Sequence, residues 1–260
     1  MEAKLQVNGV AKCFQGRAGR VEALSAASFS VTEGEFITLL GPSGCGKSTL
    51  LRIIAGLEEP SAGEVLLDGR PITGPGPERG MVFQSYTLFP WLTVRANIEF
   101  GLELKGVPRA ERQQIVARYL KLIGLTGFEQ ALPKNLSGGM KQRVAIARAL
   151  ANDPEVLLMD EPFGALDAQT RMVMQEVLLT AWEESKKTIL FVTHDVEEAV
   201  FLADKVFVMT ARPGQIKAIL DVRLPRPRPF AIKASPPFLH LKEQALALIR
   251  EETLKAVQMG

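Results

Sequence analysis

The run FITLLGPSGCGKS at residues 36–48 decides the fold class of this 260-residue chain. Its first five residues are mainly apolar, which is typical of a buried strand, and its last eight match the pattern G-x-x-x-x-G-K-[ST]. The residues that follow, 48–57, predict a helix that ends around Gly56. A strand, a glycine-rich loop and a helix in this order direct backbone N–H groups and a helix N-terminus at one point. The run therefore predicts a cradle for a phosphate group.

The loop also predicts what its side chains do. We expect Lys47 to reach the β- and γ-phosphates of a bound nucleotide and the Ser48 hydroxyl to coordinate Mg²⁺. We expect Cys45 to be a small filler rather than a nucleophile. A glycine turn that precedes Lys-Ser by chance is the alternative, and the flanking strand and helix argue against it. The predicted nucleotide-binding residues of the loop are Gly41, Pro42, Ser43, Gly44, Cys45, Gly46, Lys47, Ser48 and Thr49.

Strand and helix patterns alternate on both sides of the loop. Upstream of the loop, residues 5–14 and 27–31 predict strands. Just after the predicted helix, residues 63–69 predict an antiparallel strand between turn residues. Downstream, a strand at 156–159, a helix at 169–184 and a strand at 188–193 follow one another. The order predicts an α/β fold: a P-loop NTPase core with a parallel sheet and an N-terminal antiparallel β region.

The middle of the chain is helical, from about residue 94 to residue 150. Its clearest apolar stripe, at i, i+4, i+7 and i+8, is formed by Ile115, Tyr119, Leu122 and Ile123. We predict an inserted helical subdomain at 94–150 within a nucleotide-binding core made of residues 1–93 and 151–223. A tail at 224–260 starts with the extended run LPRPRP and ends in a helix near 239–257.

Composition limits the classes of function. Hydrophobic residues make up 47% and charged residues 23%, which is ordinary for a globular protein. The net charge of +2 argues against generic nucleic-acid binding. Two cysteines form no disulfide framework or zinc pattern, so a reducing cytoplasm fits. No signal peptide is evident, and no run approaches the roughly 18 apolar residues of a spanning helix, so a role at a membrane would need a partner.

Two carboxylates follow the apolar run at 156–159. Asp160 suits an indirect role at Mg²⁺, through water or through another ligand, and Glu161 is placed to polarise an attacking water. An ordinary acidic turn after a strand is the alternative. The phosphate loop elsewhere in the chain favours the catalytic interpretation.

The run LSGGMKQR at 136–143 predicts a second anion-binding site. Ser137 followed by Gly138 and Gly139 presents a hydroxyl and bare amides at a helix N-terminus. An ordinary helix cap is the alternative. One chain has little use for two phosphate cradles unless the second receives another molecule's nucleotide, which indicates a dimer with ATP between its subunits.

Together these motifs resemble the ATP-binding cassette (ABC) family over nearly the whole chain. Residues 136–140 look like its signature motif, with Met140 where glutamine is usual. The resemblance implies that Ser137, Gly138 and Gly139 contact the γ-phosphate of ATP held by the opposite subunit. It also implies that Asp167 crosses the dimer interface; a plain helix N-terminal acid is the alternative.

The resemblance assigns three further residues. Phe14 is expected to stack on adenine, unless it faces the core as an ordinary strand residue. Gln84 is expected to sense Mg²⁺ and the attacking water. His194 is expected to contact the γ-phosphate as a switch, with a satisfied structural histidine as the alternative.

Three functions compete: a transporter ATPase, a soluble ABC ATPase acting on nucleic acid or ribosomes, and an unrelated P-loop kinase or GTPase. The signature run disfavours the kinase or GTPase. One phosphate loop and no sustained heptads disfavour the soluble ATPase. Residues 73–84 and 163–167 most resemble the nitrate/sulfonate/taurine/bicarbonate importer class. That class implies a homodimer held at the cytoplasmic face of the inner membrane by a permease and served by a solute-binding protein, with no nucleic acid bound.

The run SYTLFPWL at 85–92 predicts where the permease docks. Tyr86, Leu88, Phe89 and Trp91 supply apolar anchors, and Pro90 disfavours a continuous helix. We expect a groove that receives a short cytoplasmic helix of the membrane subunit. Residues tucked into the local core are the alternative.

Overall fold

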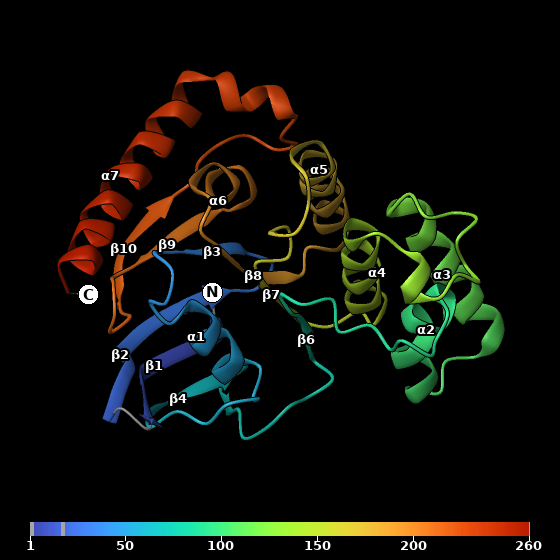
Figure 1. Cartoon of the computed structure of the whole chain (residues 1–260), viewed down its shortest axis with the longest axis horizontal. Helices are drawn as coiled ribbons and strands as arrows, with labels where there is room; N and C mark the ends of the chain where they lie inside the picture. Colours follow the sequence, from blue (N-terminus) through green and yellow to red (C-terminus); the bar gives the residue numbers. More distant parts are fainter. Residues whose placement is uncertain (1–2, 17–18, 260) are drawn as a thin grey trace.

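The computed structural model describes residues 3–16 and 19–259. Two sheets organise them: a six-stranded sheet in the order β10-β9-β3-β8-β7-β6 and a four-stranded sheet in the order β2-β1-β4-β5. Figure 1 shows three parts side by side, with the sheets and α1 in blue to orange, the helices α2 to α4 in green, and α7 in red. The expected α/β fold is confirmed.

The six-stranded sheet carries the chemistry at one edge. Its strands are β3 (Phe36–Leu40), β6 (Arg79–Val82), β7 (Val156–Asp160), β8 (Thr188–Thr193), β9 (Lys205–Met209) and β10 (Ile216–Asp221). All neighbours are parallel except β9 and β10. Every residue of β3, β7 and β8 is buried, because the sheet is covered on both faces. Parallel strands end at the same edge, so the phosphate loop, Glu161 and His194 emerge close together.

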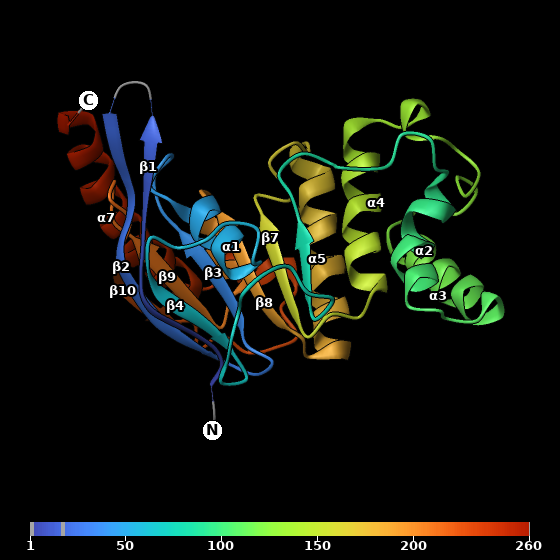
Figure 2. The same cartoon turned by 90° about the horizontal axis from the view of Figure 1, so that it is seen from below.

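The four-stranded sheet is antiparallel. It consists of β1 (Ala3–Gly16), β2 (Gly19–Thr32), β4 (Ala62–Leu67) and β5 (Arg70–Pro71). Helix α1 (Lys47–Ile54) lies between this sheet and the central one, where Leu50 packs in one core with Leu5 and Leu39. Figure 2 shows α1 in this position. The phosphate loop is therefore fixed between the two sheets.

Three helices form the green part of Figure 1: α2 (Val94–Leu104), α3 (Arg109–Leu122) and α4 (Gly138–Ala151). They share a core of their own. The predicted stripe is displaced: Val116 and Leu120 are buried with Ile123, whereas Ile115 and Tyr119 are only partly buried. The residues that are buried, Val116, Leu120 and Ile123, are also spaced by four and three residues. Periodicity alone therefore could not decide which face of the helix is buried. Helix α4 also contributes to the core of the central sheet, so it joins the two parts.

The other face of the central sheet is covered by α5 (Ala168–Ser185), α6 (Val196–Leu202) and α7 (Pro236–Met259). Short 3₁₀ helices lie at Pro133–Asn135 and Phe230–Ala234. The last helix starts before the expected Leu239, at Pro236, a residue suited to a first helical turn. The LPRPRP run lies outside helices and strands, as expected, but it bends at Arg226 and Pro227 instead of being extended throughout. Its Arg228 is buried and donates to the backbone oxygens of Phe201 and Ala203. No helix among the described residues is long and apolar enough to span a bilayer.

Candidate active site

A cavity of about 410 Å³ opens beside the phosphate loop. It brings together side chains from β1, β2, α1 and the loops that follow β6, β7 and β9. The predicted residues in its wall are Phe14, Ser43, Gly44, Gly46, Lys47, Ser48, Thr49, Gln84 and Glu161. Three residues that no sequence pattern indicated, Val21, Ala23 and Arg212, complete it.

The phosphate loop owes its shape to its glycines. Gly44 and Gly46 have φ angles of 74° and 105°, which side chains disfavour, and a Cβ on Gly46 would lie 2.7 Å from the Ala23 carbonyl oxygen. Lys47 is 5% exposed, and its ammonium group donates to the carbonyl oxygens of Gly41 (2.8 Å) and Pro42 (2.9 Å). The loop therefore holds one buried cation at its centre.

Three predicted loop residues do not line the cavity. Cys45 is buried, and its sulfur fills the space beside Gly41, where a Cβ would lie 2.9 Å away. Burial raises the pKa of the Cys45 thiol, so the unreactive form is favoured. Gly41 and Pro42 take part through their backbone contacts to Lys47.

Two of the three predicted magnesium ligands, Ser48 and Asp160, are in contact. The Ser48 hydroxyl donates to Asp160 Oδ1 at 2.7 Å, although the two residues are 112 positions apart. Burial raises the pKa of Asp160, and the Ser48 hydrogen bond works against this shift. Ser48 and Gln84 line the cavity, and Asp160 contacts Ser48. Their hydroxyl, amide and carboxylate oxygens are hard ligands, which fit Mg²⁺ shared with phosphate oxygens. No group of three His, Cys, Asp or Glu in the described residues offers a metal site of another kind.

Glu161 and His194 form the second pair. Glu161 Oε2 lies 3.0 Å from His194 Nδ1. Glu161 has a φ of 44°, an uncommon conformation for a glutamate, and its N–H is bonded to the Val192 carbonyl. This backbone turns the carboxylate into the cavity at the tip of β7, where it can accept a proton from a water molecule.

The signature residues lie elsewhere. Ser137 caps α4, and its hydroxyl accepts from the Met140 N–H at 3.2 Å. A Cβ on Gly138 would lie 2.8 Å from the Tyr86 hydroxyl, so only glycine fits without a shift. Among the described residues that line the nucleotide cavity, none comes from this motif. Within a single chain, Ser137 serves as the cap of α4. The contact of the signature residues to a nucleotide held by another subunit stays a prediction.

Asp167 also caps a helix. Its carboxylate accepts from the Thr170 N–H at 2.9 Å at the start of α5, and this bond lowers the pKa of Asp167. Its place in a dimer interface stays a prediction.

Phe14 faces the cavity. Its ring is 39% exposed and lies 5.1 Å from the Lys12 ammonium group, measured to the ring centroid. It pairs across the β1–β2 hairpin with Val21, which also lines the cavity. The alternative of a core-facing phenylalanine is therefore wrong.

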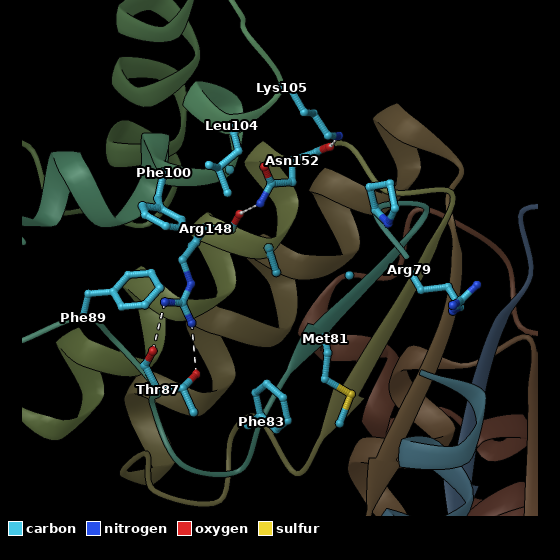
Figure 3. A pocket seen from close by; sticks show the side chains of 14 residues that line it. Arg79, Met81, Phe83, Thr87, Phe89, Phe100, Leu104, Lys105, Arg148 and Asn152 are labelled. Atoms are coloured by element: carbon cyan, nitrogen blue, oxygen red, sulfur yellow. Dashed lines mark hydrogen bonds between the residues drawn. The ribbon is translucent and has the colours of Figure 1, made fainter. Parts of the chain in front are cut away.

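A larger cavity, of about 720 Å³, lies between β6 and the helices α2 and α4. Figure 3 shows Phe83, Phe89, Phe100 and Leu104 around it, with Arg148 crossing its middle. Arg148 donates to the backbone and side-chain oxygens of Thr87 at 2.9 and 3.0 Å. We call this cavity the β6–α2 groove.

The predicted docking residues divide. Phe89 lines the groove. Trp91 is 72% exposed, and the centroid of its ring lies 5.6 Å from the centroid of the Phe89 ring. Leu88 packs instead against the core of the helical part, and Tyr86 lies against Gly138. The side chains of the apolar run thus lie in different environments, and Phe89 alone of the four predicted anchors lines the groove.

Known proteins resemble the chain closely. A family model described as ABC transporter matches residues 24–164, more than half of the chain. An uncharacterized ABC transporter ATP-binding protein of Methanocaldococcus jannaschii is 55% identical over 258 residues, covering 99% of this chain and 96% of the relative. The nitrate import ATP-binding protein NrtD of Synechocystis is 50% identical, covering 95% of each.

Two further comparisons agree. The aliphatic sulfonates import ATP-binding protein SsuB of Bacillus cereus is 48% identical over 93% of this chain and 94% of its own. The solved dimer of the ATP-binding cassette MJ0796 with ADP and Pi superposes with a TM-score of 0.76 at 34% identity, covering 85% of this chain and 99% of that one. The resemblance found in the sequence is thereby confirmed. The chain belongs to the ABC transporter family, as one of its ATP-binding and ATP-hydrolysing subunits.

Proposed function

We propose that this chain is the ATP-hydrolysing motor subunit of an ABC importer, which dimerises around two ATP molecules and drives a small solute through separate membrane subunits. The names of NrtD and SsuB support a small anion as the solute, such as nitrate, a sulfonate, taurine or bicarbonate. The proposed place of work is the cytoplasmic face of the inner membrane, where a permease holds the subunit and a solute-binding protein delivers cargo.

The proposed reaction uses the geometry of the cavity. Lys47 and the loop amides bind the β- and γ-phosphates, and Ser48, Asp160 and Gln84 would hold Mg²⁺. Bound Mg²⁺ would neutralise phosphate charge. Glu161 accepts the proton of the attacking water, and its 3.0 Å contact to His194 keeps both side chains oriented toward the γ-phosphate. Ser137, Gly138 and Gly139 of the opposite subunit complete the site.

The observation that carries the importer proposal is the β6–α2 groove. Apolar rings line it, Leu104 at its edge is 74% exposed, and its wall includes Phe83 and Thr87, which lie on either side of Gln84 in the chain. Arg148 ties α4, which begins at the signature motif, to Thr87 in the groove wall. A short amphipathic helix of the membrane subunit fits such a groove. A movement of Gln84 or of α4 would then shift the docked helix.

The test is Leu104→Glu. The residue is exposed, so the subunit should fold and hydrolyse ATP normally, but a charge in the groove should prevent co-purification with the permease. Leu246→Glu is the matched control, because Leu246 is 45% exposed on the distant α7. Recruitment of Leu104→Glu at the level of wild type would contradict docking in the groove. Leu88→Glu is unsuitable, because Leu88 packs against the helical core.

A further inference from the structure

Arg212 lies in the wall of the nucleotide cavity, in the loop between β9 and β10. Its side chain reaches the phosphate loop, where Nε donates to the Gly44 carbonyl oxygen at 3.2 Å. Nη2 lies 3.3 Å from the point where a Cβ on Gly44 would stand. Within residues 3–16 and 19–259, no salt bridge engages this guanidinium. A cation without a carboxylate partner thus stands beside a phosphate-binding loop.

The loop that carries Arg212 is fixed against both sides of the cavity. Gly214 donates to the Ala23 carbonyl at 3.0 Å and accepts from the Ser25 N–H at 3.1 Å, which attaches the loop to β2. On its other side, any side chain on Gly214 would collide with the carbonyl oxygen of Cys45 in the phosphate loop. Arg212 therefore stands between the β2 wall, where Val21 and Ala23 face the cavity, and the phosphate loop.

The C-terminal helix α7 also contacts the loop that carries Arg212. Glu252 on α7 accepts from the Ala211 N–H at 2.9 Å, next to Arg212. The same carboxylate is bonded to Lys217 at 2.7 Å and to Lys255 at 2.9 Å. Burial disfavours its charge, but the bonds from Lys217, Lys255 and the Ala211 N–H lower the pKa of Glu252 to about 2. Glu252 is therefore ionised at neutral pH and anchors the loop as an anion.

We propose that Arg212 is a further nucleotide-binding residue, whose guanidinium contacts the phosphate chain on its ribose side, and that Glu252 is its positioning residue. A guanidinium forms charge-assisted hydrogen bonds with phosphate oxygens, and Nε already uses the Gly44 carbonyl to fix its plane. This inference depends on the nucleotide site proposed above. It also gives the tail a role: α7 supports the cavity through one loop.

The first test separates charge from hydrogen bonding. Arg212→Gln keeps an N–H that can reach the Gly44 carbonyl but removes the cation. Its affinity for ADP, by isothermal titration calorimetry, should fall about tenfold, as expected for loss of a charge-assisted contact. Arg212→Lys should regain part of the loss. The difference between wild type and Arg212→Gln should shrink in high salt, because the side chain is exposed.

The second test concerns Glu252. Glu252→Gln should weaken ADP binding about threefold, but should add nothing once Arg212→Gln is present, because it acts through Arg212. Glu251→Gln is the matched control: Glu251 pairs with the same two lysines but not with Ala211. A purely structural role of Glu252 would give equal losses in both backgrounds.

The variant Lys47→Ala shows whether a negative result contradicts the Arg212 inference alone or the proposed nucleotide site as a whole. If Lys47→Ala loses ADP while Arg212→Gln binds it as wild type does, the Arg212 inference is wrong and the nucleotide site stands. If Lys47→Ala binds ADP as tightly as wild type, the proposed site itself is wrong. Weak binding by Arg212→Gln at low salt, restored in part by Arg212→Lys, supports the inference.

Discussion

Two helices of this protein begin with glycine-rich sequence, and their N-termini differ. At α1, Gly46 has no side-chain cap, and the first turn is enclosed by β2, Gln84 and Glu161, with Lys47 buried inside. At α4, Ser137 is exposed and caps its own helix. Both N-termini favour anions. Within the described part of the chain, the first alone has a buried cation with Asp160, Glu161 and a cavity beside it. We therefore interpret the second as half of a site that another subunit completes.

The largest expected effect separates the two N-termini. Lys47→Ala should weaken nucleotide binding by the monomer roughly a hundredfold, because it removes the buried cation at the centre of the loop. Ser137→Ala should leave monomer binding unchanged. Titration with a fluorescent ADP analogue measures both, with circular dichroism to show that each variant is folded. Equal losses would mean that both N-termini serve the same bound nucleotide within one chain.

His194→Ala should act on catalysis within the first site. Turnover should fall roughly ten- to a hundredfold, whereas ATP affinity should change little, since the proposed contact to the γ-phosphate would strengthen as the reaction proceeds. Steady-state ATPase assays and equilibrium binding measure the two quantities. His240→Ala is the control, because this other histidine is exposed on α7 and is bonded to Gln244. A parallel loss of affinity and turnover in His194→Ala would indicate a structural histidine.

The smallest expected effect concerns the second N-terminus. Met140→Gln introduces the residue that is usual in the signature motif, and Met140 packs partly against the core of the helical part. The change should lower the free energy of unfolding by about 1 kcal/mol and leave turnover nearly unchanged. Denaturant unfolding and ATPase assays test this. A large change in turnover would show that the motif's last residue contacts the nucleotide.

Local patterns in the sequence predicted the first site well. The strand before the phosphate loop has the expected bounds, Phe36–Leu40, and β8 has the bounds Thr188–Thr193, because both are short apolar runs between turn signals. Asp160 and Glu161 were found because they end such a run.

What sequence reasoning missed depends on contacts between distant segments. It assigned no elements to residues 196–221, where α6, β9 and β10 are found. It also gave no sign of Arg212, since a lone arginine in a loop carries no pattern. Arg212 reaches the cavity from a loop that Gly214 attaches to Ala23, a contact between residues far apart in the sequence. The prediction of the docking residues was incomplete for the same reason. The SYTLFPWL run shows that apolar anchors are present, but it does not show which of their side chains face the groove.

The most direct test of the shared site is dimer formation. Glu161→Gln should bind ATP without hydrolysing it, so saturating ATP with Mg²⁺ should shift the protein from monomer to dimer in size-exclusion chromatography with light scattering. Adding Ser137→Arg should keep one ATP bound per chain but leave the protein monomeric, because the new charge and bulk would stand in the interface. A Glu161→Gln protein that stays monomeric at saturating ATP, or a double variant that still dimerises, would contradict the account.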